Sequence, residues 1–145
     1  MKNQDYLNKI SEKIIGCAFT VSNTLGSGFL EKVYQNALVI ELLNEGLEVE
    51  KEKAITIFYQ GKVVGEYFAD ILVNHQIIIE TKAVQSLNEI HQAQLLNYLK
   101  ATKLPLGLLI NFGTPKVQIK RMLNDINSHI WTQIKNPCSS ASICG

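Results

Sequence analysis

The sequence predicts a single α/β domain in which two helices precede three strands, a further helix and a fourth strand. Three observations support this order. Apolar residues recur every three or four positions up to about residue 45, which is the period of an amphipathic helix. Between residues 47 and 83 they alternate with polar residues and are rich in branched side chains, as in strands. A short, almost wholly apolar run at residues 104–112 is typical of a buried strand.

The first two helices are each predicted by an apolar stripe that ends at glycine. The first stripe ends at "GSG", residues 26–28, and comprises Leu7, Ile10, Ile14, Cys17, Val21 and Leu25. The second ends at Gly46, and its inward residues are expected to be Leu30, Val33, Ala37, Ile40 and Leu43. A third helix is indicated by "SLNEIHQAQLLNYLKATK", where Ser86 and Glu89 have the spacing of a capping box.

The predicted strands run over residues 47–59, 63–73 and 77–83, with the turns "QGK" and "NHQ" between them. A last strand is indicated at residues 117–123, and residues 124–135 have a helical pattern. No repeat or linker divides the chain. We therefore expect a single domain over residues 1–135 and a flexible C-terminal tail over residues 136–145.

Composition limits the class of protein. The 145 residues are 46% hydrophobic, which fits an ordered globular chain. No stretch has the apolar core of a signal sequence or the length of a membrane span, so a cytoplasmic location and no membrane partner are expected. Cys17, Cys138 and Cys144 have no metal-ligand spacing with the three histidines, and Cys17 is expected to be a small core residue.

Charge is distributed unevenly along the chain. Residues 1–81 carry seven lysines against eleven acidic residues, a net charge of −4, whereas residues 82–145 carry seven basic residues against two acidic ones, a net charge of +5. Such asymmetry is typical of an acidic site beside a surface that faces a polyanion, and equally of an uneven solvated surface.

Three charged residues interrupt the apolar hairpin "ADILVNHQIIIETKA". If the turn takes the three residues 74–76, Asp70 opposes Glu80, and Lys82 shares the face of Glu80. A two-residue turn would place the two carboxylates on opposite faces. Opposed carboxylates repel unless a cation lies between them, which makes this pair a candidate Mg²⁺ site. The alternative is a partly buried ion pair of Asp70 and Lys82, with Glu80 reaching solvent.

Two helices carry further candidates. Glu31 and Tyr34 of "GFLEKVY" lie one turn apart, although Glu31 could instead close a capping box with Gly28 as the N-cap. In "IHQAQLLNYL", a polar stripe consists of His91, Gln94 and Tyr98. The alternative is that this stripe is the solvated outer face of an amphipathic helix.

Five blocks of the sequence resemble, in order, those of the small bacterial and archaeal family called GxxExxY proteins. They are "GFLEKVY", "GEYFADILV", "IIIETKAV", "HQAQLLNYLKAT" and "LGLLINFG", and the resemblance covers roughly residues 5–123. That family is assigned to the PD-(D/E)XK nuclease superfamily. The resemblance therefore implies a PD-(D/E)XK nuclease-like core of helix, three strands, helix and strand, with an extra N-terminal helix and a mixed sheet flanked by helices.

The resemblance also implies a metal-dependent nuclease site. By motif, the catalytic residues would be Glu31, Asp70, Glu80, Lys82, Gln94 and Tyr98. The implied ligands of Mg²⁺ or Mn²⁺ are Asp70, Glu80, the carbonyl of Thr81, and Glu31. One departure is Ala69, which stands where the superfamily motif has proline before the aspartate.

The implied partner is nucleic acid, DNA in preference to RNA, and nothing in the sequence indicates a homo-oligomer. Phosphate contacts are expected from the basic C-terminal half, namely from Lys116, Lys120 and Arg121. The alternative is a catalytically inactive module of the same fold that binds nucleic acid or a protein partner.

Overall fold

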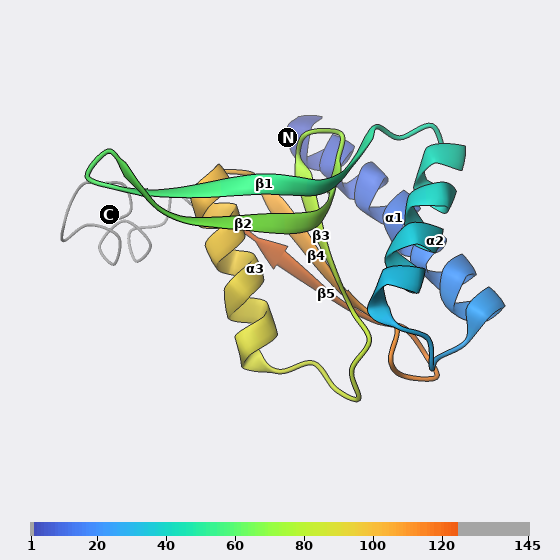
Figure 1. The fold of residues 1–145 in the computed structure, drawn as a ribbon. Helices are drawn as coiled ribbons and strands as arrows, with labels where there is room; N and C mark the ends of the chain where they lie inside the picture. Colours follow the sequence, from blue (N-terminus) through green and yellow to red (C-terminus); the bar gives the residue numbers. More distant parts are fainter. Residues whose placement is uncertain (1, 125–145) are drawn as a thin grey trace.

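The structure is a computed structural model that describes residues 2–124, and its architecture is the expected α/β one (Figure 1). In chain order the elements are α1 (Lys2–Leu25), α2 (Glu31–Asn44), β1 (Val49–Tyr59), β2 (Lys62–Val73), β3 (Ile77–Lys82), α3 (Glu89–Thr102), β4 (Leu106–Asn111) and β5 (Gln118–Leu123). Their order, including the last strand, is the order that the sequence predicts. The helix expected up to residue 135 and the tail expected over residues 136–145 lie outside the described residues.

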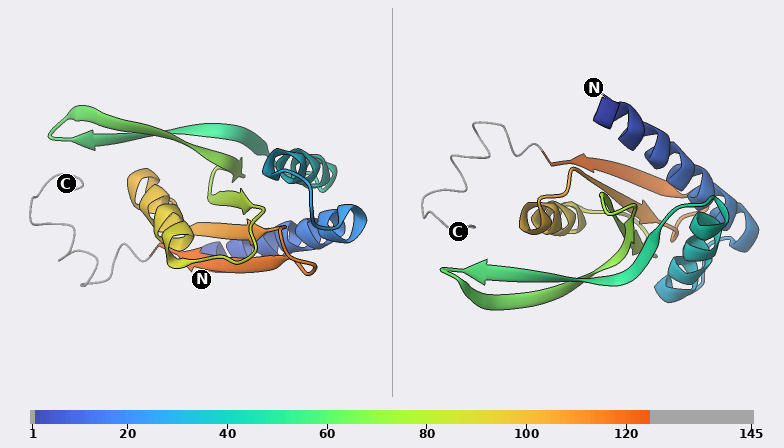
Figure 2. Two further views of the ribbon diagram at one scale, coloured as in Figure 1. Left: turned by 60° about the horizontal axis from the view of Figure 1, so that its bottom comes forward. Right: turned by 90° about the horizontal axis from the view of Figure 1, so that it is seen from above.

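The five strands form one mixed sheet in the order β1-β2-β3-β4-β5. Strands β3 and β4 are parallel and are connected through α3, whereas the other neighbouring strands are antiparallel. Figure 2 shows α3 and the pair α1 and α2 against different parts of this sheet. Side chains of β3 alternate between two cores: Ile77 and Ile79 pack with α1 and α2, and Ile78 packs with α3.

Strands β1 and β2 extend beyond the rest of the sheet. They pair with each other along nearly their whole length, whereas β2 pairs with β3 only over residues 71–73. Residues 53–69, which we call the β1–β2 arm, therefore project beside α3, as Figures 1 and 2 show. A register shift lies within the arm, between Ile57 and Phe58.

Helix α1 buries the predicted stripe, and five of its six residues are buried. Cys17 is among them, as expected, and burial, followed by the charges of Glu45 and Glu41, raises the pKa of its thiol to about 11. Within residues 2–124, no helix combines the length and apolarity that crossing a membrane requires.

The inward face of α2 differs from the predicted one. Tyr34, Leu38 and Leu42 are fully buried, whereas Leu30 is 80% exposed and Ile40 is 59% exposed. Both sets of residues recur at helical spacing, so the period alone does not choose between them. The tertiary contact that decides is the stacking of Tyr34 on Phe112, with ring centroids 4.9 Å apart.

The N-terminus of α3 also differs from the prediction. Its N-cap is Asn88 rather than Ser86, and Asn88 Oδ1 accepts hydrogen bonds from the backbone N–H groups of Ile90 and His91 at 2.9 and 3.1 Å. In return, His91 Nδ1 accepts from the N–H of Asn88 at 3.3 Å. Serine and asparagine are both favoured caps, and the asparagine two residues further along caps the helix instead of the predicted serine.

Candidate active site where β2 and β3 separate

The turn between β2 and β3 has three residues. Val73 pairs with Ile77, and the antiparallel ladder continues for two more pairs, to Ile71 with Ile79. Residues Asp70 and Glu80 come next on the two strands. This register confirms the three-residue turn and sets the two carboxylates beside each other at the end of the ladder.

Past that point the two carboxylates take the place of backbone pairing. The N–H of Asp70 donates to Glu80 Oε2 at 2.9 Å. The N–H and the hydroxyl of Thr81 both donate to Asp70 Oδ2, at 2.8 and 2.9 Å. Each carboxylate is therefore fixed by the strand that carries the other, and the strands separate around them.

Glu80 is buried, with 5% of its surface exposed. Burial and the nearby charge of Asp70 raise the pKa of its carboxyl to about 8, while the Asp70 N–H and the charge of Lys82 act in the opposite direction. Glu80 thus does not reach solvent, and no ion pair of Asp70 with Lys82 is formed among the described residues. The alternative, a partly buried ion pair of Asp70 and Lys82 with Glu80 reaching solvent, is therefore wrong.

The motif "GFLEKVY" is held together by Tyr34. Its buried hydroxyl donates to the carbonyl of Gly26 at 2.6 Å and accepts from the N–H of Phe29 at 3.1 Å. Gly28, in the loop so fixed, has a φ of +117°, which favours glycine. The tyrosine and the glycine of the motif therefore shape the loop that leads into α2.

Glu31 begins α2 directly after this loop. The N-cap is Leu30 and makes no side-chain capping bond, so the capping box with Gly28 as N-cap is not formed. Burial and the charge of Asp70 raise the pKa of Glu31, and Lys82 lowers it. The charges of Asp70 and Lys82 thus both act on Glu31.

Helix α3 contributes Gln94 and Tyr98 to the candidate site. Gln94 Nε2 donates to the hydroxyl of Tyr98 at 3.0 Å, and Tyr98 is 6% exposed. Burial, followed by the charge of Glu80, raises the pKa of Tyr98. His91 belongs to the helix cap instead, so the predicted polar stripe contributes two of its three members to the site.

Two buried polar residues support the site and were missed by sequence reasoning. Gln35 Nε2 donates to the carbonyl of Asp70 at 3.1 Å. Asn111 is fully buried at the end of β4, and its side chain accepts from the N–H of Val84 and donates to the carbonyl of Val84, each at 2.9 Å. The available signals were a glutamine directly after Tyr34 and an asparagine closing an apolar strand.

The three basic residues that are expected to contact phosphates do not cluster at the carboxylate pair. Lys116 and Lys120 are exposed. Lys120 pairs with Leu109, which in turn pairs with Glu80, so Lys120 lies two strands from Glu80 in the same row of the sheet. Arg121 belongs to the next row and donates to Asn8 Oδ1 of α1 at 2.7 Å, away from the hairpin carboxylates.

The oxygen atoms at the end of the β2–β3 ladder are of the kind that binds a hard divalent cation. Two carboxylates lie together, Glu80 is buried, and neither Asp70 nor Glu80 forms an ion pair with any described residue. Within residues 2–124, however, no group of three or more histidine, cysteine, aspartate or glutamate side chains is arranged to hold a metal ion. The fitting donor set is therefore the two carboxylates with a backbone oxygen such as the Thr81 carbonyl, and Glu31 does not complete a three-carboxylate cluster.

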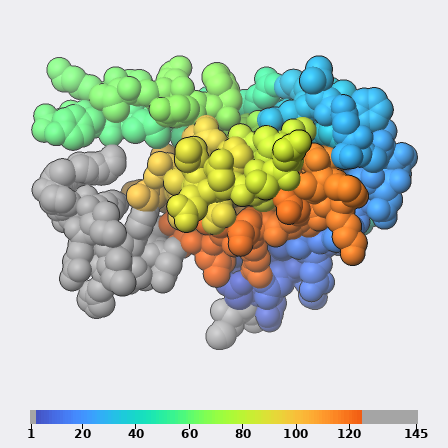
Figure 3. Space-filling view, turned by 90° about the horizontal axis from the view of Figure 1, so that it is seen from below, coloured from blue at the N-terminus to red at the C-terminus, as the bar shows by residue number. Residues whose placement is uncertain are grey.

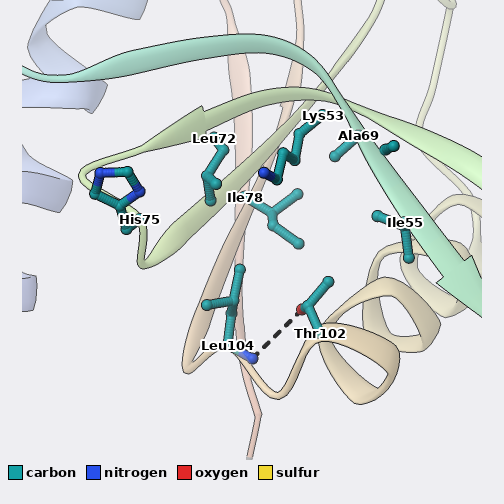
Figure 4. A pocket seen from close by; sticks show the side chains of 9 residues that line it. Lys53, Ile55, Ala69, Leu72, His75, Ile78, Thr102 and Leu104 are labelled. Atoms are coloured by element: carbon teal, nitrogen blue, oxygen red, sulfur yellow. Dashed lines mark hydrogen bonds between the residues drawn. The ribbon is translucent and has the colours of Figure 1, made fainter.

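A pocket of about 360 Å³ lies on the α3 side of the sheet, between β1–β3 and the C-terminal end of α3 (Figure 4). Its mainly apolar lining consists of Lys53, Ala54, Ile55, Ala69, Leu72, His75, Ile78, Thr102 and Leu104. None of the six candidate catalytic residues lines it. We therefore do not place the reaction in this pocket.

Comparison with known proteins agrees with this geometry. A family model described as the PD-(D/E)XK nuclease superfamily matches residues 8–122. The solved structure "Crystal structure of SSO0001" is similar in fold, with a TM-score of 0.50 and 23% sequence identity over 64% of this chain and 49% of that one. This chain thus spans about half the length of that protein. No curated protein matches the chain significantly.

Proposed function

The chain belongs to the PD-(D/E)XK nuclease superfamily, and from that premise we propose that it is a metal-dependent nuclease that hydrolyses phosphodiester bonds of nucleic acid, DNA in preference to RNA. The observation that carries the proposal is the pair Asp70 and Glu80, held where β2 and β3 separate. Stability does not require such a pair, because apolar residues of similar volume would fill buried positions at lower cost. The motif around Glu31 and Tyr34 supports membership of the GxxExxY family within the superfamily, and we propose the cytoplasm as its location.

Asp70, Glu80 and the Thr81 carbonyl would hold the metal ion, Mg²⁺ or Mn²⁺, with Glu31 acting through water. When bound, such an ion polarises the scissile phosphate and lowers the pKa of a coordinated water. The protein fixes the two carboxylates in advance, since each already accepts hydrogen bonds from the opposite strand. That preorganisation lowers the cost of gathering negative charge at one place.

The remaining residues would act on the substrate. The ammonium group of Lys82 would donate to the attacking water or to a phosphate oxygen, where negative charge grows in the transition state. The Tyr98 hydroxyl accepts from Gln94, so its own proton is available to a phosphate oxygen. Lys116 and Lys120, both exposed, would contact phosphates further along the strand, and Arg121 less directly.

The decisive experiment is a cleavage assay on labelled single- and double-stranded DNA and RNA with Mg²⁺, Mn²⁺ or EDTA. Asp70→Asn is the sharpest variant, because its side-chain carbonyl can still accept from Thr81 while the charge is lost. We expect metal-dependent cleavage that Asp70→Asn and Lys82→Ala each reduce by at least about 100-fold. Glu66→Gln, at an exposed carboxylate on the same strand, is the matched control and should cleave like the parent.

Equal behaviour of the parent and both site variants on every substrate would refute the nuclease function. Circular dichroism of each variant shows whether a loss of cleavage reflects a loss of fold. If the parent binds nucleic acid without cutting it, the protein is the inactive binding module instead.

A further inference from the structure

Tyr67, on the β1–β2 arm, brings an aromatic ring to the edge of the candidate site. It lies opposite Ile55, a buried residue of the core on the α3 side, so its side chain is on the same face of the arm. The ring centroids of Tyr67 and Tyr98 are 5.8 Å apart, with the ring planes inclined at 45°. Glu80 shares its strand face with Ile78, which packs with Tyr98, and the charge of Glu80 acts on Tyr98, so this contact brings the arm close to the carboxylate pair.

The ring of Tyr67 remains partly accessible to solvent despite this contact. Tyr67 is 48% exposed, and its hydroxyl makes no hydrogen bond to any described residue. Tyr34 and Tyr98, the other tyrosines of the site, are buried and hydrogen-bonded.

The surroundings of Tyr67 fit a path for a nucleic-acid strand. Figure 3 shows one face of the molecule, on which the arm lies along one side of α3 and the segments around β4 and β5 lie along the other. Tyr67 belongs to the arm, and Lys82 lies at the end of β3, near the carboxylates. An exposed ring next to a site that would hold a phosphate is the pairing by which proteins bind single strands.

We propose that Tyr67 stacks on a base of the substrate, and that the substrate is single-stranded where it enters the site. This inference rests on the function proposed above and specifies its substrate class. A base can stack on a side chain only if its face is accessible, and in a duplex both faces of each internal base are covered by neighbouring bases. An aromatic ring fixed beside the metal ligands therefore selects unpaired nucleotides, whether in DNA or in RNA.

The test is a binding measurement in EDTA, which needs no turnover. Fluorescence anisotropy would be recorded with a labelled single-stranded DNA, an RNA of the same sequence, and the corresponding DNA duplex. Tyr67→Leu keeps an apolar contact with Tyr98 but removes the aromatic face, and we expect it to weaken single-strand binding by about 5- to 100-fold with little effect on the duplex. Tyr67→Phe should bind within about twofold of the parent, because stacking needs the ring and not the hydroxyl.

Phe68→Ala is the matched control, since Phe68 is the next residue, is 59% exposed and points to the opposite face of the arm. It should leave single-strand binding unchanged. The inference is overturned if Tyr67→Leu binds single strands like the parent, if it weakens duplex binding equally, or if Phe68→Ala causes the same loss. Binding and cleavage separate the two proposals: a Tyr67-dependent preference for single strands supports the inference even where Asp70→Asn leaves cleavage unchanged and the nuclease function fails.

Discussion

The substitution Glu80→Gln tests whether the buried, ionised carboxyl of Glu80 beside Asp70 lowers the free energy of unfolding. Glutamine has nearly the shape of glutamate, and its side-chain carbonyl can still accept the hydrogen bond from the N–H of Asp70. What the change removes is the titrating carboxyl, whose pKa in the folded protein is raised to about 8 by burial and by Asp70. The variant therefore isolates the charge from the packing.

The sign of the effect follows from linkage. Because the folded-state pKa of Glu80 lies above its ordinary value of 4.5, the folded protein binds more protons than the unfolded chain between pH 4.5 and about pH 8. Its contribution to stability is fully present below pH 4.5 and is lost as the pH rises through 8. At about 1.4 kcal/mol per pKa unit, the loss from Glu80 reaches about 4–5 kcal/mol, while the uncharged glutamine of the variant contributes no such slope.

The assay is urea unfolding in EDTA, followed by circular dichroism from pH 5 to pH 9. We expect Glu80→Gln to match the parent near pH 5 and to exceed it by several kcal/mol at pH 9. Adding Mg²⁺ at pH 9 should stabilise the parent, because the cation binds and neutralises its two carboxylates. It should leave the variant unchanged, because the variant has lost one of them. A stability difference that is constant with pH, or equal to that of Glu66→Gln, would contradict the reasoning.

Three further predictions concern the packing and hydrogen bonds of the fold that carries the site. Gly113→Ala should lower the free energy of unfolding by at least about 2 kcal/mol in urea, because its Cβ would lie 2.3 Å from a backbone oxygen of Val84; Gly16→Ala, with nothing within 4 Å, should not. Tyr34→Phe should cost about 1–2 kcal/mol and slow cleavage, since the loop before Glu31 loses two hydrogen bonds; unchanged unfolding and cleavage would argue against that. With the other two cysteines changed to serine, Cys17 should resist a thiol reagent at pH 8 until urea unfolds the chain, because burial raises its pKa to about 11; rapid labelling of the native protein would contradict its burial.

The hairpin charges could be predicted from the sequence because they follow from local geometry. A strand has a side-chain period of two, so once the turn has three residues the register of Asp70 and Glu80 follows. The structure was needed to exclude the two-residue turn. It was also needed to show that the carboxylates bind to backbone N–H groups across the gap instead of pairing with Lys82.

The face of α2 could not be predicted, and the reason is physical. Leu30 and Ile40 belong to one apolar stripe, Leu38 and Leu42 to another, and burying either removes similar apolar area from water. The stacking of Tyr34 on Phe112 chooses between them, and that contact joins residues 78 positions apart in the chain. The same holds for Gln35 and Asn111, which bind the backbone of Asp70 and Val84, groups that only the folded chain brings near.

These contacts explain why so much buried polarity gathers around one short stretch of sheet. The antiparallel ladder between β2 and β3 stops after Ile71 and Ile79, so the backbone groups of Asp70 and Thr81 that face the gap would lack partners. Side chains from β3, β2 and α2 supply these partners. Glu80 accepts from the N–H of Asp70, Asp70 accepts from the N–H of Thr81, and Gln35 donates to the carbonyl of Asp70. The network satisfies the backbone but leaves two carboxylates side by side. The opening of the sheet and the accumulation of negative charge therefore have one origin, and a cation bound there would relieve the charge without disturbing the hydrogen bonds.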